Sequence, residues 1–298
     1  MRLKFITFTK AIAVLSVSAV IATGCGNNAK KTEEATGADT SASGPLINIS
    51  GEIFSIPSPI QTALLIKASG VSYSKNILNA ANKSSQYSTN FSKAINLGIF
   101  GADLGYVTIY EQSQDAIGYL NAAKKLSDGL GVSAAFDAKT MERFTKNIGN
   151  KDSMLNLVGV AYRSSDAYLK TNDRSDVSGL VLAGGWIESL YFTTDIYKTK
   201  PNEEVRLRIA EQKLSLQSLI KLLTPYYSQP EYTKFIDNLY DLSTVYDGVE
   251  FKYTFVKPTT DAEKKITTIN SKTDVKITPE QIESISQKIK AIRNQVVG

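Results

Sequence analysis

The sequence predicts a mainly α fold, a pseudo-symmetric multi-helix bundle built from a degenerate helical duplication, with a small C-terminal β-hairpin and a final helix. Three observations predict it. From residue 57 to about residue 246, apolar residues recur at spacings of three and four, the period of an amphipathic helix. Two of these helical segments align with each other at an offset of 85 positions. Residues 249–256 alternate apolar and polar, the period of a strand.

Turn and cap residues set the expected helix boundaries. Pro59 suits a first helical turn and Gly70 an end, while Asp137 opens a short helix that Gly149 stops. Together these signals divide the helical region into short, separately capped elements. The expected helices span residues 59–69, 88–110, 113 to the Gly129/Gly131 pair, 137–149, 152–171, 175–198, 202–223 and 230–246.

The C-terminal part changes character. We expect the strand at 249–256 to pair with residues 266–269 across the polar loop KPTTDAEKK. Thr278 then reads as an N-cap before Pro279 and an acidic first turn, so a final helix should run to about residue 295. Its expected apolar stripe consists of Ile282, Ile285, Ile289 and Ile292.

The internal alignment predicts two copies, at about residues 86–150 and 172–240. Such copies would cover apolar faces that neither can cover alone. Small residues form a stripe on each aligned helix, and we expect these stripes to let two helix backbones approach closely. They are Gly98, Ala102 and Gly105 on the first helix, and Gly179, Ala183 and Gly184 on the second.

The expected organisation has four parts. Residues 1–24 read as an export signal with a basic start and an uncharged apolar run at 11–22, which is shorter than the roughly 20 residues of a membrane-spanning helix. Residues 25–46 read as a flexible tether, because they lack aromatic residues and are nearly free of large aliphatic ones. Residues 47–246 form the helical domain, and residues 247–298 pack on the same domain.

The segment Ile21-Ala22-Thr23-Gly24-Cys25 resembles the lipobox of bacterial lipoproteins. The resemblance implies that Cys25 is acylated and anchors an exported protein in the cell envelope. Gly26 in place of Asp after the cysteine is typical of lipoproteins sorted to the outer membrane of Gram-negative cells. The sequence departs from the family at Ala22, where Leu is favoured. The alternative is a soluble secreted protein in which Cys25 lies at the cleavage point by chance.

The helical body also carries a resemblance. The segment LGIFGADLGYVTIY at residues 97–110 is similar to uncharacterised all-helical lipoproteins of Gram-negative bacteria, a likeness that implies no activity.

Composition restricts the chemistry. The 298 residues include no His and one Cys, which excludes Ser-His-Asp and Cys-His catalysis, imidazole ligands, an intrachain disulfide and a thiolate zinc cluster. We therefore expect no metal site and no cofactor. The net charge of +5 falls to +2 once the three basic residues of the signal are removed, so the sequence does not predict a nucleic-acid partner.

Asp103 and Glu188 are aligned carboxylates on the apolar stripes of their helices. A buried carboxylate needs a donor or it takes up a proton. One interpretation places the two across a cleft whose aromatic wall consists of Tyr106, Tyr191 and Trp186. The favoured interpretation is a structural polar pair bonded to tyrosine hydroxyls or to an arginine, such as Arg163 or Arg206.

Two functional hypotheses follow. The favoured one is a lipid-anchored envelope protein, not an enzyme, that binds a protein, peptide or glycan or serves in assembly. Its membrane contact is made through acylated Cys25. The alternative is a carboxylate-dependent glycan hydrolase that uses Asp103 and Glu188.

Overall fold

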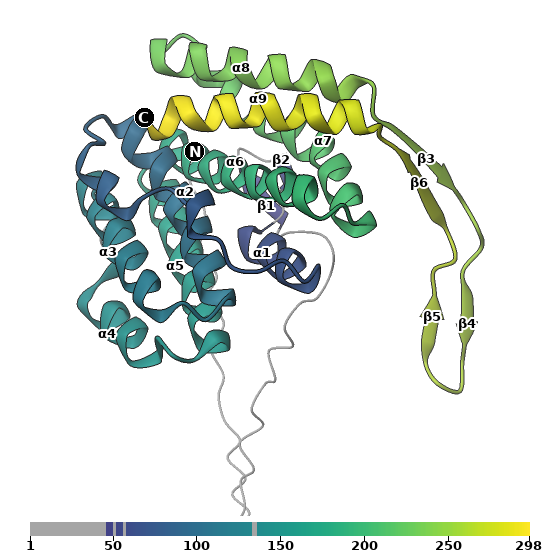
Figure 1. Ribbon diagram of the computed structural model, residues 1–298, viewed down its shortest axis with the longest axis horizontal. Helices are drawn as coiled ribbons and strands as arrows, with labels where there is room; N and C mark the ends of the chain where they lie inside the picture. The colour runs from purple at the N-terminus through teal and green to yellow at the C-terminus, as the bar shows by residue number, and fades with distance from the viewer. Residues whose placement is uncertain (1–45, 50–51, 56–57, 133–135) are drawn as a thin grey trace, which may run out of the picture. The chain divides into compact units, whose positions relative to one another are not determined.

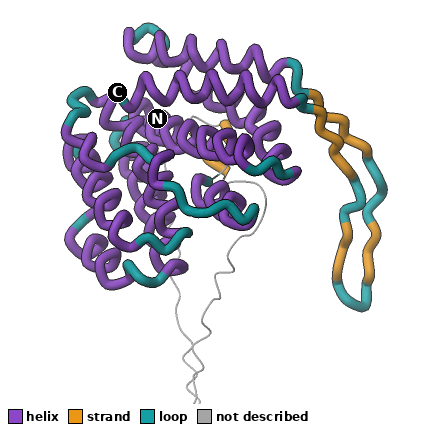
Figure 2. Tube along the Cα trace, viewed as in Figure 1, coloured by secondary structure: helices purple, strands orange, loops and turns teal. Residues whose placement is uncertain are grey.

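Helices make up most of the protein. The computed structural model describes residues 46–49, 52–55, 58–132 and 136–298. Within these ranges the prediction of a mainly α fold with small C-terminal antiparallel strands and a final helix is confirmed (Figures 1 and 2). The expected export signal, Cys25 and the tether up to residue 45 lie outside the described residues.

The α-helices follow the expected order. They are α1 (Pro59–Ala68), α2 (Asn90–Ile109), α3 (Ser113–Leu130), α4 (Ala138–Asn147), α5 (Lys151–Thr171), α6 (Ser175–Thr199), α7 (Glu203–Leu223), α8 (Pro230–Asp247) and α9 (Pro279–Val297). Short 3-10 helices occupy Lys75–Ile77, Ala81–Ser85 and Thr224–Tyr226. In the described residues, no helix combines the length and hydropathy that a membrane crossing requires.

Local chemistry explains the helix ends. The Asp137 side chain accepts a hydrogen bond from the Thr140 amide, which confirms its predicted place before α4. Thr278 and Gln281 form a reciprocal capping box at the start of α9. Gly131 ends α3 with φ of +73°, a left-handed conformation that favours glycine.

Helices α2 and α6 form the centre of the fold. Every residue of α2 from Ala94 to Ile109 is buried, and most of α6 is buried as well. A helix that is apolar or small on all sides must be covered on all sides. Accordingly α1, α3 and α5 pack on α2, while α1, α7 and α9 pack on α6.

The two central helices meet backbone to backbone. A Cβ atom added to Gly98 would lie 2.0 Å from the carbonyl oxygen of Val181, and one added to Gly184 would lie 1.9 Å from that of Ile95. Tyr106 further along α2 packs on Phe192 of α6 with ring centroids 5.1 Å apart, so the helices run in the same direction. The predicted close approach at the small-residue stripes is therefore confirmed at Gly98 and Gly184.

The C-terminal strands pair differently from the prediction. Strand β3 (Glu250–Thr254) pairs with β6 (Lys272–Lys276), and β4 (Thr259–Asp261) pairs with β5 (Ile266–Thr268). The predicted pairing of 249–256 with 266–269 was wrong, because part of the presumed loop is itself a strand.

The turn explains this register. The Asp261 side chain accepts hydrogen bonds from the amides of Glu263 and Lys264, and Lys265 adopts φ of +53°. This tight turn brings Asp261 opposite Ile266 and fixes the hairpin from its tip.

A further antiparallel pair joins β1 (Leu46–Ile49) to β2 (Glu52–Ser55), which the sequence pattern did not predict. Leu46, the last residue assigned to the tether, begins β1.

Candidate functional site

The structure brings Asp103 and Glu188 together in the core. Asp103 projects from α2 and Glu188 from α6, and both side chains are 0% exposed. Their proximity follows from the parallel packing of the two helices, which sets aligned positions side by side. The charge of Glu188 contributes to the raised pKa of Asp103, as expected for two carboxylates that lie close together. The pair lies in the core and not along an open cleft, because both side chains are fully buried.

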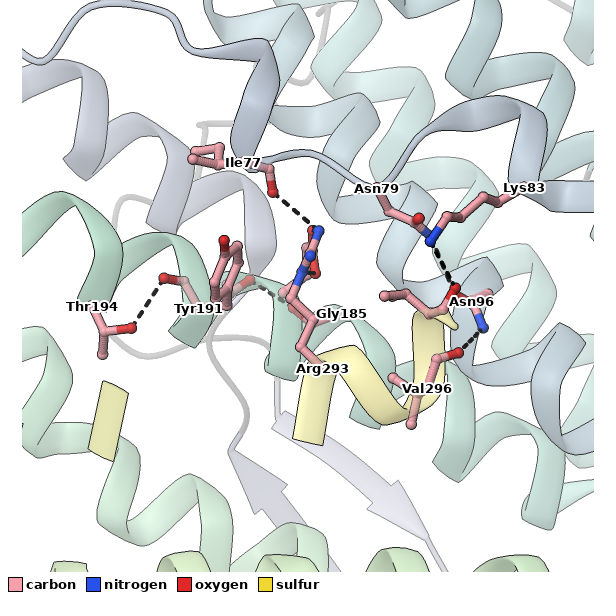
Figure 3. A network of polar contacts seen from close by, with 12 residues as sticks. Ile77, Asn79, Lys83, Asn96, Gly185, Tyr191, Thr194, Arg293 and Val296 are labelled. Carbon is pink, nitrogen blue, oxygen red and sulfur yellow. Dashed lines mark hydrogen bonds and ion pairs between the residues drawn. The ribbon is translucent and has the colours of Figure 1, made fainter. Parts of the chain in front are cut away.

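Arg293 of α9 forms a buried ion pair with Glu188, and Figure 3 shows Arg293 with its neighbours. Its Nε and Nη2 atoms donate to the two carboxylate oxygens of Glu188, each at 2.6 Å. Nη2 also donates to the carbonyl oxygen of Ile77 at 3.0 Å, and the guanidinium lies 4.3 Å from the ring centroid of Tyr191. This bidentate, ring-stacked geometry suits a buried arginine, which is only 7% exposed.

The electrostatics assign a protonation state to each acid. Burial and, second, the charge of Glu188 raise the pKa of Asp103 well above its usual range. Burial raises the pKa of Glu188 too, but the charge and hydrogen bonds of Arg293 oppose that rise. The pKa of Arg293 is raised because the attraction of Glu188 outweighs burial. We therefore assign Asp103 as a neutral acid beside an ionised Glu188 that is paired with Arg293.

Asp103 should make stability depend on pH. Its folded pKa lies above the ordinary 3.8, so the folded state holds a proton that the unfolded state has lost between the two values. The free energy of unfolding then falls as pH rises through that interval, by up to about 1.4 kcal/mol per pH unit. Asp103→Asn removes this proton and keeps a neutral polar side chain of nearly the same size at this position. We expect the free energy of unfolding in urea to fall less between about pH 5 and about pH 7 in the variant than in the wild type.

Asp115 supplies the matched control for that titration. Hydrogen bonds from Lys75 and Tyr73 hold the pKa of Asp115 below its usual range, so it titrates below the tested interval. Asp115→Asn should leave the decline between the two pH values unchanged. A decline that persists in full in Asp103→Asn would show that Asp103 is not the group responsible.

The expected aromatic wall is not assembled around the carboxylates. Tyr106 is fully buried, and its hydroxyl accepts a hydrogen bond from the Ser74 amide. Trp186 is buried on another side of α6 and donates from Nε1 to Gln212 at 2.9 Å. Tyr191 is half-buried and contacts the site through Arg293. Of these three aromatic residues, Tyr191 is the one that contacts Arg293 of the ion pair.

The arginine that pairs with Glu188 was not the one expected. Arg206 forms a bidentate pair with Glu203 on the surface of α7, and Arg163 is exposed on α5. The sequence did hold a signal for Arg293. It follows Ile289 by four positions and so lies on the apolar stripe of the final helix, as the two carboxylates lie on theirs.

A second polar group fixes the end of α9 beside the ion pair (Figure 3). The Asn96 amide, fully buried on α2, donates to the carbonyl oxygen of Val296 at 2.8 Å. Asn79 donates to Asn96 and to the Tyr87 hydroxyl, which in turn donates to the carbonyl oxygen of Val297. These bonds satisfy carbonyls that a helix end leaves without partners. Arg293 and Asn96 thus fasten α9 to the two central helices.

An open groove lies between α7 and α8. It encloses about 510 Å³, and its lining combines basic, aromatic and hydroxyl side chains: Lys213, Gln217, Lys221, Tyr240, Ser243 and Tyr246 among others. Tyr240 is 46% exposed, and Lys213 donates to the carbonyl oxygen of Val249 at 2.9 Å. The groove is therefore an open surface feature with both polar and apolar lining side chains.

In the described part of the chain, no three His, Cys, Asp or Glu side chains come together as a metal site would require. Comparison of the chain with protein-family models, with curated proteins and with solved structures found no match.

Proposed function

We propose that this chain is a lipid-anchored cell-envelope protein with a non-catalytic binding or assembly role. The complete burial of Asp103 and Glu188, with Glu188 paired to Arg293, carries the non-catalytic part of this proposal. These two acids are the strongest catalytic candidates in a chain without histidine, and both are buried in the core. A partner can therefore contact only the surface residues of the folded protein.

The glycan-hydrolase alternative receives less support. A neutral acid beside an ionised carboxylate is the arrangement that glycoside hydrolysis uses, but a substrate must reach both groups. Here both groups are 0% exposed, and Arg293 of α9, which also donates to the carbonyl oxygen of Ile77, lies against Glu188. A glycan would reach them only after α9 had left the core, which would break the ion pair.

The lipid anchor rests on the lipobox resemblance at Cys25 and on the tether that follows. We expect Cys25→Ala to release the protein from the membrane fraction, because acylation of that cysteine supplies the anchor. Fractionation and immunoblotting of cells that express the wild type and the variant measure this directly. Thr32→Ala, in the tether, is the matched control and should stay with the membrane.

The position after the cysteine adds a test of location. Gly26→Asp should move the protein from the outer to the inner membrane in a density gradient, since the resemblance ties outer-membrane sorting to the absence of Asp there.

Unchanged membrane retention of Cys25→Ala would contradict the anchor. It would leave the binding role of the folded body to be judged on its own surfaces.

We also propose that α2 and α6 derive from a degenerate duplication, with copies at about residues 86–150 and 172–240. The contacts of Gly98 on α2 and Gly184 on α6 support this proposal. Adding 86 to the residue numbers of one set of contacts gives the other set, an offset one larger than that of the sequence alignment. Gly98 meets Val181 and Gly185, and Gly184 meets Ile95 and Ile99. Reciprocal contacts of this kind are expected where two copies of one helix pack around a local twofold axis.

A further inference from the structure

A small pocket lies where the end of α2 and the start of α3 meet the start of α5. It encloses about 20 Å³, which is room for one water-sized group. Its lining includes Thr108 from the last turn of α2, Gln112 and Ser113 at the start of α3, and Lys151, the first residue of α5. Three helix ends therefore meet around one small space.

Thr108 contributes a buried hydroxyl to this pocket. The residue is 5% exposed, and its Oγ1 atom has no hydrogen-bond partner in the part of the chain that the structure describes. Other helical threonines, such as Thr145 and Thr193, donate to the carbonyl oxygen four positions earlier. A buried hydroxyl without a partner costs free energy. A group that enters the pocket and accepts from Thr108 therefore gains a bond that the fold itself does not use.

The start of α3 favours a negatively charged group at the same place. The first N–H groups of a helix have no acceptor within the helix. Gln112, the N-cap residue of α3, gives them no side-chain bond, and its Nε2 atom donates to the carbonyl oxygen of Tyr110. Ser113 donates from Oγ to the carbonyl oxygen of Ile148. The N–H groups and the positive end of the helix dipole are thus open to an anion.

The side-chain charges around the pocket also favour an anion. Lys151 is half-buried and lines the pocket. The acid in the lining, Glu111, forms an ion pair of 3.2 Å with Lys67. Asp115, in the first turn of α3, forms an ion pair of 2.5 Å with Lys75. Because a lysine balances each of these acids, Lys151 gives the site its net positive charge.

We propose that this pocket binds a small oxyanion, a phosphate or carboxylate group that inserts one oxygen beside Thr108. The volume admits one oxygen-sized group and excludes a ring or a chain. The Thr108 hydroxyl donates to that oxygen, and the N–H groups at the start of α3 together with Lys151 hold the remaining charge. This site is independent of the lipid anchor and of the envelope location proposed above.

The larger groove between α7 and α8 lacks a group of this kind. Of the buried side-chain atoms that are without a partner in the described residues, none lines that groove. Its Lys213 already donates to the carbonyl oxygens of Asp247 and Val249 at the end of α8. The small pocket is therefore the one in which a buried donor selects the chemistry of its ligand.

Titration calorimetry of the full chain in detergent tests the site, with sodium phosphate and sodium acetate as probes and the ionic strength fixed by sodium chloride. We expect saturable binding at one site per chain, and the probe that binds more tightly identifies the oxyanion. Thr108→Val removes the hydroxyl and keeps the shape. It should weaken binding about tenfold or more, because a hydrogen bond to a charged group contributes that much. Lys151→Gln should weaken binding too, whereas Lys146→Gln, at an exposed lysine of α4 paired with Glu142, should not.

Urea unfolding without either probe separates ligand binding from a structural role. Because Oγ1 of Thr108 has no partner to lose, Thr108→Val should be at least as stable as the wild type. A clearly less stable variant would contradict the proposal, because the hydroxyl would then have a partner within the fold. A wild type that binds neither probe, or a Thr108→Val that binds as tightly as the wild type, would overturn it. Equal weakening by Lys146→Gln and Lys151→Gln would also overturn it, because positive charge anywhere on this surface would then suffice.

Discussion

Arg293→Met is expected to cost the protein about 3 to 5 kcal/mol of unfolding free energy. The substitution leaves Glu188 buried next to Asp103 without the guanidinium that holds its charge. An isolated ionised group in the core is costly, and Met restores the volume but not the charge. The variant also loses the bond to the carbonyl oxygen of Ile77. Urea unfolding followed by circular dichroism measures the loss.

Arg206→Met is the matched control. Arg206 also binds a glutamate through two nitrogen atoms, but its partner Glu203 is exposed on the surface of α7. Exposed pairs of this kind contribute about 0 to 1 kcal/mol. Equal losses in the two variants would mean that burial of the Glu188 pair has no energetic consequence.

Gly98→Ala should destabilise the fold by about 3 kcal/mol or more. The added methyl group would lie 2.0 Å from the carbonyl oxygen of Val181, and both groups belong to helix backbones that cannot rotate away. The central helices would have to separate along their whole contact, which loosens the core around them. Thermal and urea unfolding of the variant measure this cost, and Gly184→Ala should behave alike.

Gly118→Ala separates this clash from the effect of glycine itself. Gly118 lies within α3, and a methyl group there would meet the nearest atom, in Ala81, at an ordinary 3.7 Å. Alanine is the better helix former, so we expect this variant to gain up to about 1 kcal/mol. A destabilised Gly118→Ala, or a Gly98→Ala of wild-type stability, would contradict the close helix crossing.

The helices were predictable because their signals are local. Periodicity identified each α-helix, and residues such as Pro59, Asp137 and Thr278 fixed helix starts through first turns and caps. The hairpin register was not predictable in the same way. A register shifts by one residue between the two strand pairs, where Ser271 and Asn270 bond to the backbone of the facing strand. The strand at Leu46–Ile49 is too short for a period-two pattern to identify.

The buried site was half predictable. A buried carboxylate on an apolar stripe needs a hydrogen-bond donor or a counterion, so Asp103 and Glu188 predicted a polar cluster in the core. The donor came from Arg293, 105 positions after Glu188, and only the packing of α9 on the central helices brings them together. Periodicity places a residue on a face of its own helix but does not name the helix that faces it.

A double-mutant cycle on Glu188→Gln and Arg293→Met tests most directly whether these groups serve the fold. Each single variant leaves a buried polar group unpaired, whereas the double variant leaves neither a charge nor its counterion. We predict that the double variant is more stable than Arg293→Met alone, with an interaction energy of about 3 kcal/mol in urea unfolding. Strictly additive losses, with the double variant less stable than either single variant, would contradict a structural ion pair at the centre of this protein.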